Sequence, residues 1–188
     1  MKSFNLPITL TWLRIVVIPV LVALYYLPTD WMGEHLRDDI ATIFFIAAAV
    51  TDWLDGWLAR RWNQTSNFGA FLDPVADKLM VCTALLVLLN LQRVDSFIVL
   101  IIIGREITVS ALREWMASVG ARDNVAVHWL GKFKTTAQMI AIPCLLFHQT
   151  VYNIDLGMVG EALIIVAAIL TLWSMVYYLR KAWPQLHA

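Results

Sequence analysis

The sequence predicts an all-α polytopic membrane protein: a bundle of six transmembrane helices with a short N-terminal interfacial segment. Of the 188 residues, 60% are hydrophobic and 15% are charged. A soluble domain has about 45–50% apolar and about 25% charged residues. The mean hydropathy is +0.69. A soluble core of this size needs a polar shell that these residues cannot supply, so a bilayer is the simplest surrounding.

A membrane-spanning helix needs roughly 20 mostly apolar residues, and six stretches satisfy this requirement. They are Ile8–Leu27, Ile40–Leu58, Val75–Leu91, Phe97–Met116, Phe133–Tyr152 and Met158–Leu179. No small-residue cleavage site follows the first stretch, so we expect it to be a span and not a signal peptide. Lys2–Leu13 is expected to include a short interfacial helix. Short connections and the lack of repeats predict a single membrane domain over 1–188.

The basic residues give the orientation of these spans. With six spans both termini share one side, and every Lys and Arg except Arg37 and Arg93 falls on that side. Cytoplasmic loops carry the excess of Lys and Arg, which places both termini in the cytoplasm. The net charge is zero, so nothing favours a nucleic-acid partner. Cys82 and Cys144 lie in apolar runs and are interpreted as small buried hydrophobic residues.

Four acids near the cytoplasmic ends of the second and third spans are the main functional signal. Each aspartate at the centre of a bilayer helix costs about 2.5–3.5 kcal/mol on insertion scales. Asp52 and Asp55 are three residues apart, and Asp73 and Asp77 are four apart, so each pair shares a helix face. Pro74 predicts a helix start near Asp73. The two helices can therefore bring all four carboxylates together.

Two interpretations of this cluster remain open. Clustered carboxylate oxygens are suited to Mg²⁺, Mn²⁺ or Ca²⁺, and the lack of a nearby His argues against zinc. Alternatively, the acids form an ion-pair network with Arg60, Arg61 and Lys78, which is a structural role.

The same residues form an extended motif, Asp52-x2-Asp55-Gly56-x2-Ala59-Arg60-x8-Gly69-x3-Asp73-x3-Asp77. This motif resembles the signature of the CDP-alcohol phosphatidyltransferase family at every fixed position. The resemblance implies six transmembrane helices, usually as a homodimer, in the bacterial inner membrane with the active site on the cytoplasmic side. It also implies transfer of a phosphatidyl group from CDP-diacylglycerol to an alcohol, with CMP leaving.

The resemblance implies roles for individual residues. Asp52, Asp55, Asp73 and Asp77 would share a divalent-metal site for Mg²⁺ or Mn²⁺, commonly with two ions, and Asp77 would be the general base. CDP-diacylglycerol would be bound by a set that includes two of these acids: Asp52, Gly56, Ala59, Arg60, Gly69 and Asp73. Asn5 and Thr11 would contribute from a segment that resembles the amino terminus of family members using glycerol 3-phosphate; many of these have Asn where this chain has Ile8.

Basic residues in later spans favour glycerol 3-phosphate as the acceptor alcohol. The stretches around Gly104-Arg105-Glu106 and Gly131-Lys132-x-Lys134-Thr135 also resemble members that use it. A phosphate-bearing acceptor needs a basic patch, and the candidates are Arg105, Arg113, Lys132, Lys134 and Thr135. Successive helical residues point about 100° apart, so Glu106 is not expected to partner Arg105. A pairing of Arg105 with an Asp of the cluster is the structural alternative.

Other functions are weighed against this one. Within the family, the alternative acceptors are a second phospholipid, as in cardiolipin synthases, inositol phosphate and serine. From another class, a divalent-cation transporter would use intramembrane acids as an ion path, but it predicts acids on several spans at mid-depth. A purely structural membrane scaffold predicts that replacing Asp73 leaves lipid composition unchanged.

Overall fold

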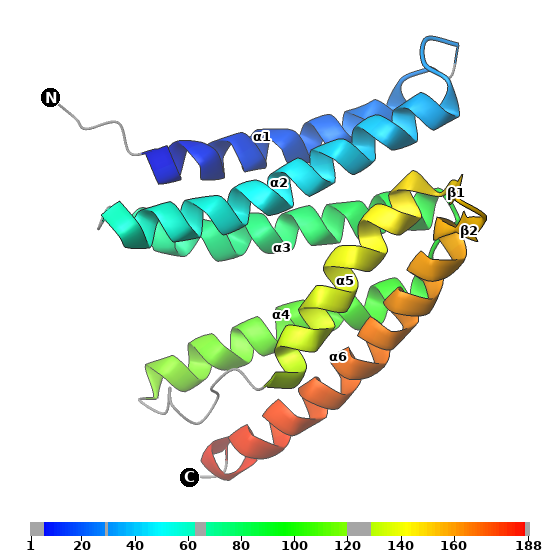
Figure 1. Cartoon of the computed structure of the whole chain (residues 1–188). Helices are drawn as coiled ribbons and strands as arrows, with labels where there is room; N and C mark the ends of the chain where they lie inside the picture. Colours follow the sequence, from blue (N-terminus) through cyan, green and yellow to red (C-terminus); the bar gives the residue numbers. More distant parts are fainter. Residues whose placement is uncertain (1–5, 29, 63–66, 120–128, 187–188) are drawn as a thin grey trace, which may run out of the picture.

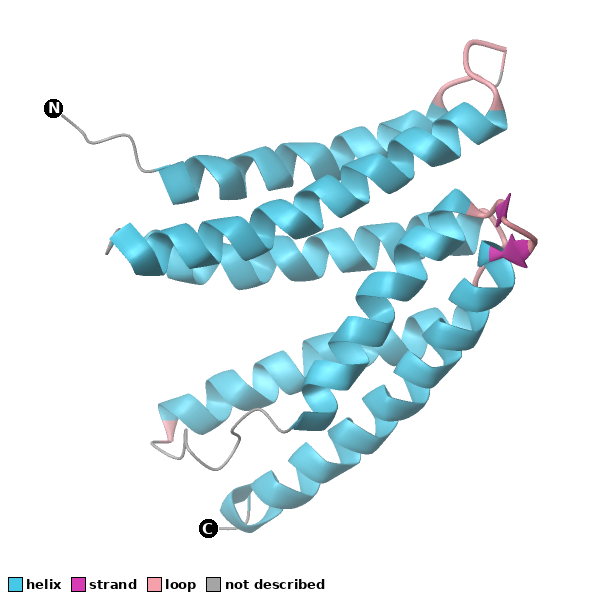
Figure 2. Cartoon of the chain, in the orientation of Figure 1, coloured by secondary structure: helices cyan, strands magenta, loops and turns pink. Residues whose placement is uncertain are grey.

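The computed structural model describes residues 6–28, 30–62, 67–119 and 129–186, with some side chains near the helix ends left out. Within these residues there are six helices and one small hairpin, and almost all of the chain is helical (Figure 2). The elements are α1 (Leu6–Tyr26), α2 (Glu34–Trp62), α3 (Asn67–Asn90), α4 (Ser96–Ser118), α5 (Trp129–Phe147), β1 (Thr150–Val151), β2 (Ile154–Asp155) and α6 (Leu156–Leu186).

Helices α1, α2 and α3 run alongside one another, whereas α5 and α6 are inclined to them (Figure 1). Helix α1 packs on α2 and α3, while α5 packs along α6, and α4 contacts both α6 and α3. Consecutive helices reverse direction, so both chain termini lie at one end of the bundle and the β1–β2 hairpin lies at the other (Figure 1). The end that holds both termini is called the terminal end below, and the opposite end is called the hairpin end.

One hydrophobic core joins all six helices. Its buried side chains include Leu21, Phe45, Leu85, Ile102, Ile142 and Ile164, one from each helix in chain order. Gly160 lets α5 and α6 approach closely, because a Cβ there would lie 2.6 Å from Cγ of Leu145. A second, smaller cluster of Val109, Met116 and Tyr178 joins α4 to α6 near the terminal end.

Large apolar side chains also cover the outside of the bundle. Each helix exposes at least two of them, for example Val16, Ile43, Leu86, Leu100, Ile140 and Ile169. Soluble monomers rarely expose apolar surface on this scale. One described helical segment, Leu156–Arg180, is long and apolar enough to cross a membrane by itself. Thr11–Tyr26 and Phe133–Phe147 are shorter apolar segments, so the count of six spans stays a prediction.

Each expected span corresponds to a helix, but some boundaries were wrong. The fifth span was expected to reach Tyr152, whereas α5 ends at Phe147. Tyr152 and Asn153 have φ of 49° and 65° and form the turn of the hairpin, in which Val151 pairs with Ile154. A two-residue hairpin turn requires this left-handed backbone. The helix itself ends earlier, because His148 also has a left-handed backbone, with φ of 48°.

Two predictions about where helices begin also need correction. Helix α3 begins at Asn67, so Pro74 lies inside the helix and does not start it. Proline is tolerated within membrane helices because neighbouring groups satisfy the freed backbone carbonyl. The expected interfacial helix is not separate either: from Leu6 onward its residues are the first turns of α1, with Pro7 in the first turn where it is tolerated.

Candidate functional site

Helix α1 links the acidic faces of α2 and α3. The Thr11 hydroxyl donates a hydrogen bond of 2.6 Å to Oδ1 of Asp73. Nη1 of Arg14 lies 2.5 Å from Oδ1 of Asp52. Thr11 and Arg14 are one helical turn apart and therefore neighbours on one face. Asp52 of α2 and Asp73 of α3 are thus held beside the same turn of α1.

Arg14 is a site residue that sequence reasoning missed. It was counted among the positive charges of the cytoplasmic side, yet it is only 2% exposed. One of the four acids, Asp52, therefore has a basic partner, as in the structural alternative, and this partner comes from α1. The available signal was the spacing of Thr11 and Arg14, a hydroxyl and a guanidinium on one face of an apolar helix.

Asp77 lies one turn beyond Asp73 and lines a cavity of about 60 Å³. The cavity lies between α3, α4 and α5, and its walls are Asp77, Lys78, Val81, Glu106, Lys134, Thr135, Gln138 and Met139. Lys134 is 3% exposed and Gln138 is 4% exposed. A buried polar cavity of this kind, with a carboxylate and an ammonium group on its walls, can bind a small polar ligand.

Glu106 organises the basic wall of this cavity. Its Oε1 accepts hydrogen bonds from Nζ of Lys134 and from Nη1 of Arg105, the latter at 3.2 Å. Lys78 donates to the Ser110 hydroxyl at 2.5 Å, and this hydroxyl donates to the Glu106 carbonyl at 2.5 Å. The expectation that Glu106 does not partner Arg105 was therefore wrong, because the long side chains bridge the angle between their Cα–Cβ directions.

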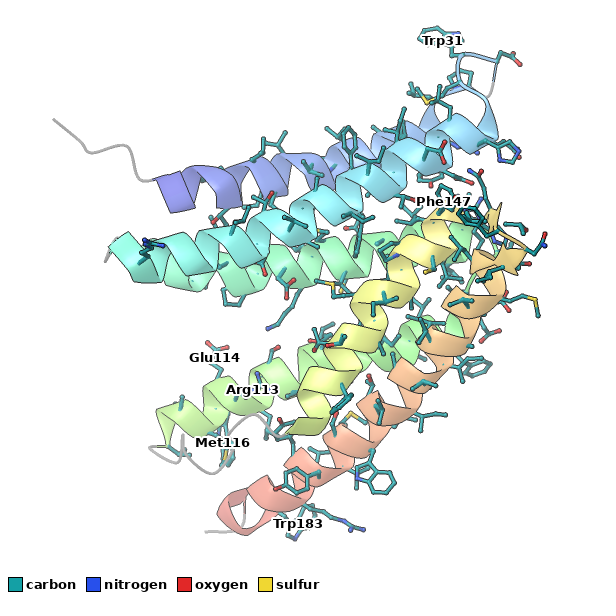
Figure 3. The ribbon with its side chains drawn as sticks, viewed as in Figure 1. Trp31, Arg113, Glu114, Met116, Phe147 and Trp183 are labelled. Atoms are coloured by element: carbon teal, nitrogen blue, oxygen red, sulfur yellow. The ribbon has the colours of Figure 1, made fainter. Side chains whose placement is uncertain are left out.

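The predicted acceptor-binding residues separate into three groups. Lys134 and Thr135 line the cavity. Arg105 lies behind Glu106, where it also donates to the Ser174 hydroxyl at 3.3 Å and lies over the Tyr178 ring at 5.9 Å. It does not pair with the aspartates in the described contacts. Arg113 lies over the same ring at 5.5 Å, near Glu114 and Met116 at the end of α4 (Figure 3).

Several predicted residues cannot be placed. Asn5 lies outside the described residues. Gly69 is an exception, because the structure describes it as buried near the start of α3. For five others the helix is described but the side chain is not: Asp55, Gly56, Ala59, Arg60 and Lys132. Among the described side chains, no three potential metal ligands meet closely enough to hold an ion. Asp55 is not among these described side chains. The described acids still offer what Mg²⁺ and Mn²⁺ prefer, carboxylate oxygens from two neighbouring helices.

Comparison with known proteins identifies the family. Residues 4–173 match the sequence profile described as CDP-alcohol phosphatidyltransferase. The chain belongs to the CDP-alcohol phosphatidyltransferase family. This membership confirms the resemblance drawn from the Asp52–Asp77 motif.

Relatives within this family are similar over almost their whole length. Proteins of Shigella flexneri serotype 5b (strain 8401), Salmonella choleraesuis (strain SC-B67) and Escherichia coli (strain K12) are each 50% identical over 184 residues, which is 96% of this chain and 96% of the relative. All three are named CDP-diacylglycerol–glycerol-3-phosphate 3-phosphatidyltransferase.

Proposed function

We propose that this chain transfers a phosphatidyl group from CDP-diacylglycerol to glycerol 3-phosphate, giving phosphatidylglycerophosphate and CMP. The observation that carries the proposal is the cavity that is lined by Asp77 together with Glu106, Lys134 and Thr135. A carboxylate that can take a proton thus lies near an ammonium group that can bind a phosphate. The names of relatives that are 50% identical over 96% of the chain support the same reaction.

The acceptor is bound at the basic wall. Lys134 and Thr135 contact its phosphate, Arg105 supports them from behind Glu106, and Arg113 and Lys132 add positive charge near the cytoplasmic edge. The acceptor hydroxyl then points toward Asp77, which accepts its proton. The freed oxygen forms a bond to the phosphorus of the phosphatidyl group. The bond from that phosphorus to the CMP oxygen breaks, and CMP leaves with the electron pair.

The donor is bound by the motif on α2 and α3. Asp52, Asp55, Asp73 and Asp77 would hold Mg²⁺ or Mn²⁺, with two ions proposed. The ions would supply charge neutralisation of the pyrophosphate and polarisation of the attacked phosphorus. Gly56, Ala59, Arg60, Gly69, Asn5 and Thr11 surround the cytidine diphosphate. The hydrogen bond from Thr11 fixes one oxygen of Asp73, so that carboxylate is oriented before any ligand arrives.

The chain acts in the bacterial inner membrane as a single domain over 1–188. Six helices span the bilayer, with both termini and the site in the cytoplasm, and two copies form a homodimer. The exposed apolar side chains on all six helices support this placement, as does the concentration of Lys and Arg at the terminal end. Acyl chains of the donor stay in the bilayer while glycerol 3-phosphate enters from water.

An acceptor competition with the purified protein tests the reaction. CMP release from CDP-diacylglycerol is measured with glycerol 3-phosphate, serine, inositol phosphate or phosphatidylglycerol as the only alcohol. We expect rapid release with glycerol 3-phosphate and little with the others. Release with serine but not with glycerol 3-phosphate would overturn the choice of acceptor. Magnesium flux into liposomes without any CDP-lipid would favour a transporter instead.

A further inference from the structure

Three basic side chains from three helices meet around Glu106. Arg105 of α4 and Lys134 of α5 donate directly to its carboxylate. Lys78 of α3 reaches its backbone carbonyl through the Ser110 hydroxyl, by two hydrogen bonds of 2.5 Å. Glu106 therefore connects the helix that carries Asp77 with the helix that carries Lys134. The sequence predicted no role for Glu106, and the proposed reaction has no step at its carboxylate.

The burial of these groups makes the arrangement costly to change. Lys134 is 3% exposed and Arg105 is 6% exposed, so neither charge can turn toward bulk water without moving a helix. Without the carboxylate, two cations would be left buried beside each other. Removing one partner of a buried ion pair leaves an uncompensated charge and is strongly unfavourable.

The charges of this cluster match one class of ligand. Lys78 and Lys134 line the cavity together with the carboxylates of Glu106 and Asp77, and Arg105 lies behind Glu106. A phosphate monoester carries about −1.5 to −2 at pH 7. The ammonium groups of the cavity wall can donate charge-assisted hydrogen bonds to the oxygens of such a phosphate. An uncharged alcohol such as glycerol cannot make these bonds.

We propose that Glu106 is a positioning residue: with Arg105 behind it, it holds Lys134 at the cavity that Asp77 also lines, and so sets where the phosphate of the acceptor binds relative to the base. This inference rests on the proposed function. Its consequence is specific, because loss of the Glu106 charge weakens binding of the phosphorylated acceptor while the donor site on α2 and α3 is unaffected.

The test is Glu106→Gln in the full-length protein, with kinetics measured separately for each substrate. Gln keeps the size and one acceptor oxygen but loses the charge. We expect the KM for glycerol 3-phosphate to rise by about tenfold or more, the scale of a lost charged hydrogen bond. The KM for CDP-diacylglycerol should change by less than about twofold, since that site is elsewhere. Glu106→Asp, which keeps the charge one methylene shorter, should restore part of the affinity.

Two controls separate positioning from a purely structural role. Glu114→Gln removes an exposed carboxylate from the same helix and should leave both KM values unchanged. In a Lys134→Gln background, Glu106→Gln should have little further effect on the KM for glycerol 3-phosphate, because the two residues act as a unit. A merely structural Glu106 would instead lower the thermal midpoint and the activity equally in both backgrounds.

Several outcomes would overturn the inference. They are an unchanged KM for glycerol 3-phosphate in folded Glu106→Gln, an equal rise in both KM values, or a Glu106→Asp variant no better than Glu106→Gln. If the Gln variant does not accumulate, the Asp variant decides alone: a selective shift for the acceptor supports the inference, and no shift overturns it. Wild-type protein that releases no CMP with glycerol 3-phosphate would instead reject the proposed function.

Discussion

The two ends of the bundle carry clusters of the same residue types, and their difference is instructive. At the hairpin end, Asp38 accepts from Nη2 of Arg93 at 2.5 Å and from the Tyr25 hydroxyl at 3.1 Å. Nη1 of Arg93 donates to the carbonyls of Leu145 and Leu146 at 3.2 and 2.7 Å. These carbonyls belong to the last turn of α5, which has no intrahelical donors for them. Both oxygens of Asp38 are thus used to join α1, α2 and α5.

At the terminal end, charged groups from three helices line a small cavity. Asp77 and Lys134 both line it, and Glu106 has two cations of its own. A closed network such as that of Asp38 fixes the positions of helices, whereas a cavity lined by unlike charges can admit a ligand. Buried charge alone therefore does not identify a site in this protein. Charges beside a cavity do not identify one alone either, because Arg93, Asp95 and Glu161 line a cavity of about 350 Å³ at the hairpin end. The cavity at the terminal end differs in that it is lined by Asp77, the last residue of the family motif.

Asp77→Asn should give the largest effect. A small effect would contradict the difference drawn between the terminal end and the hairpin end. Removing the proposed base should lower kcat by about 10²–10⁴-fold, with the thermal midpoint close to that of wild type. The rate of CMP release at saturating substrates is the measurement. If donor affinity falls as much as kcat, Asp77 acts as a metal ligand more than as a base.

Arg93→Ala should show the opposite pattern at the hairpin end. It leaves the nearly buried Asp38 without its cation, and breaking a buried pair costs about 3–5 kcal/mol. We expect a lower unfolding midpoint in detergent and normal kcat per folded molecule. A selective loss of kcat with unchanged stability would mean that the hairpin end takes part in the reaction.

Lys134→Ala should raise the KM for glycerol 3-phosphate about 10- to 100-fold, because a charge-assisted hydrogen bond to phosphate is lost. The KM for CDP-diacylglycerol should hardly change. Lys78→Ala is a useful comparison, since Lys78 lines the same cavity but is bound to Ser110. A larger effect on the donor than on the acceptor would place the phosphate site elsewhere.

Tyr25→Phe should have the smallest effect. It removes one hydrogen bond to Asp38 and keeps the ring that Arg37 lies over at 5.0 Å. A net loss of about 1 kcal/mol in stability follows from one such bond, measured by thermal or chemical unfolding. Activity should be unchanged. A loss as large as that of Arg93→Ala would mean that the hydroxyl, and not the ion pair, holds this end together.

Much of the fold could be predicted from sequence because long apolar runs leave few alternatives to helices in a bilayer. The boundaries were less predictable. Helix α3 begins at Asn67, well before Pro74, and α5 stops at Phe147 because His148, which is not a glycine, has a left-handed backbone. Apolar content measures how well a segment fits lipid, not where its hydrogen bonding ends.

The site could be predicted in part, for reasons of the same kind. Spacing along a helix brought Asp73 and Asp77 to one face, and the motif indicated the chemistry of the cluster. Arg14 and Glu106 were missed because their roles depend on contacts between helices: Arg14 with Asp52 of α2, and Glu106 with Lys134 of α5. The Cα–Cβ direction also predicts contacts poorly for long side chains, as the Arg105–Glu106 pair shows.

The central claim is that aspartates of α2 and α3 bind divalent cations that support the transfer. Mn²⁺ binding to the purified protein, followed by electron paramagnetic resonance, tests it most directly when wild type and Asp73→Asn are compared. We predict that wild type binds Mn²⁺ in the absence of substrate and that the variant loses most of this binding while staying folded. Equal Mn²⁺ binding by the two proteins would contradict the claim.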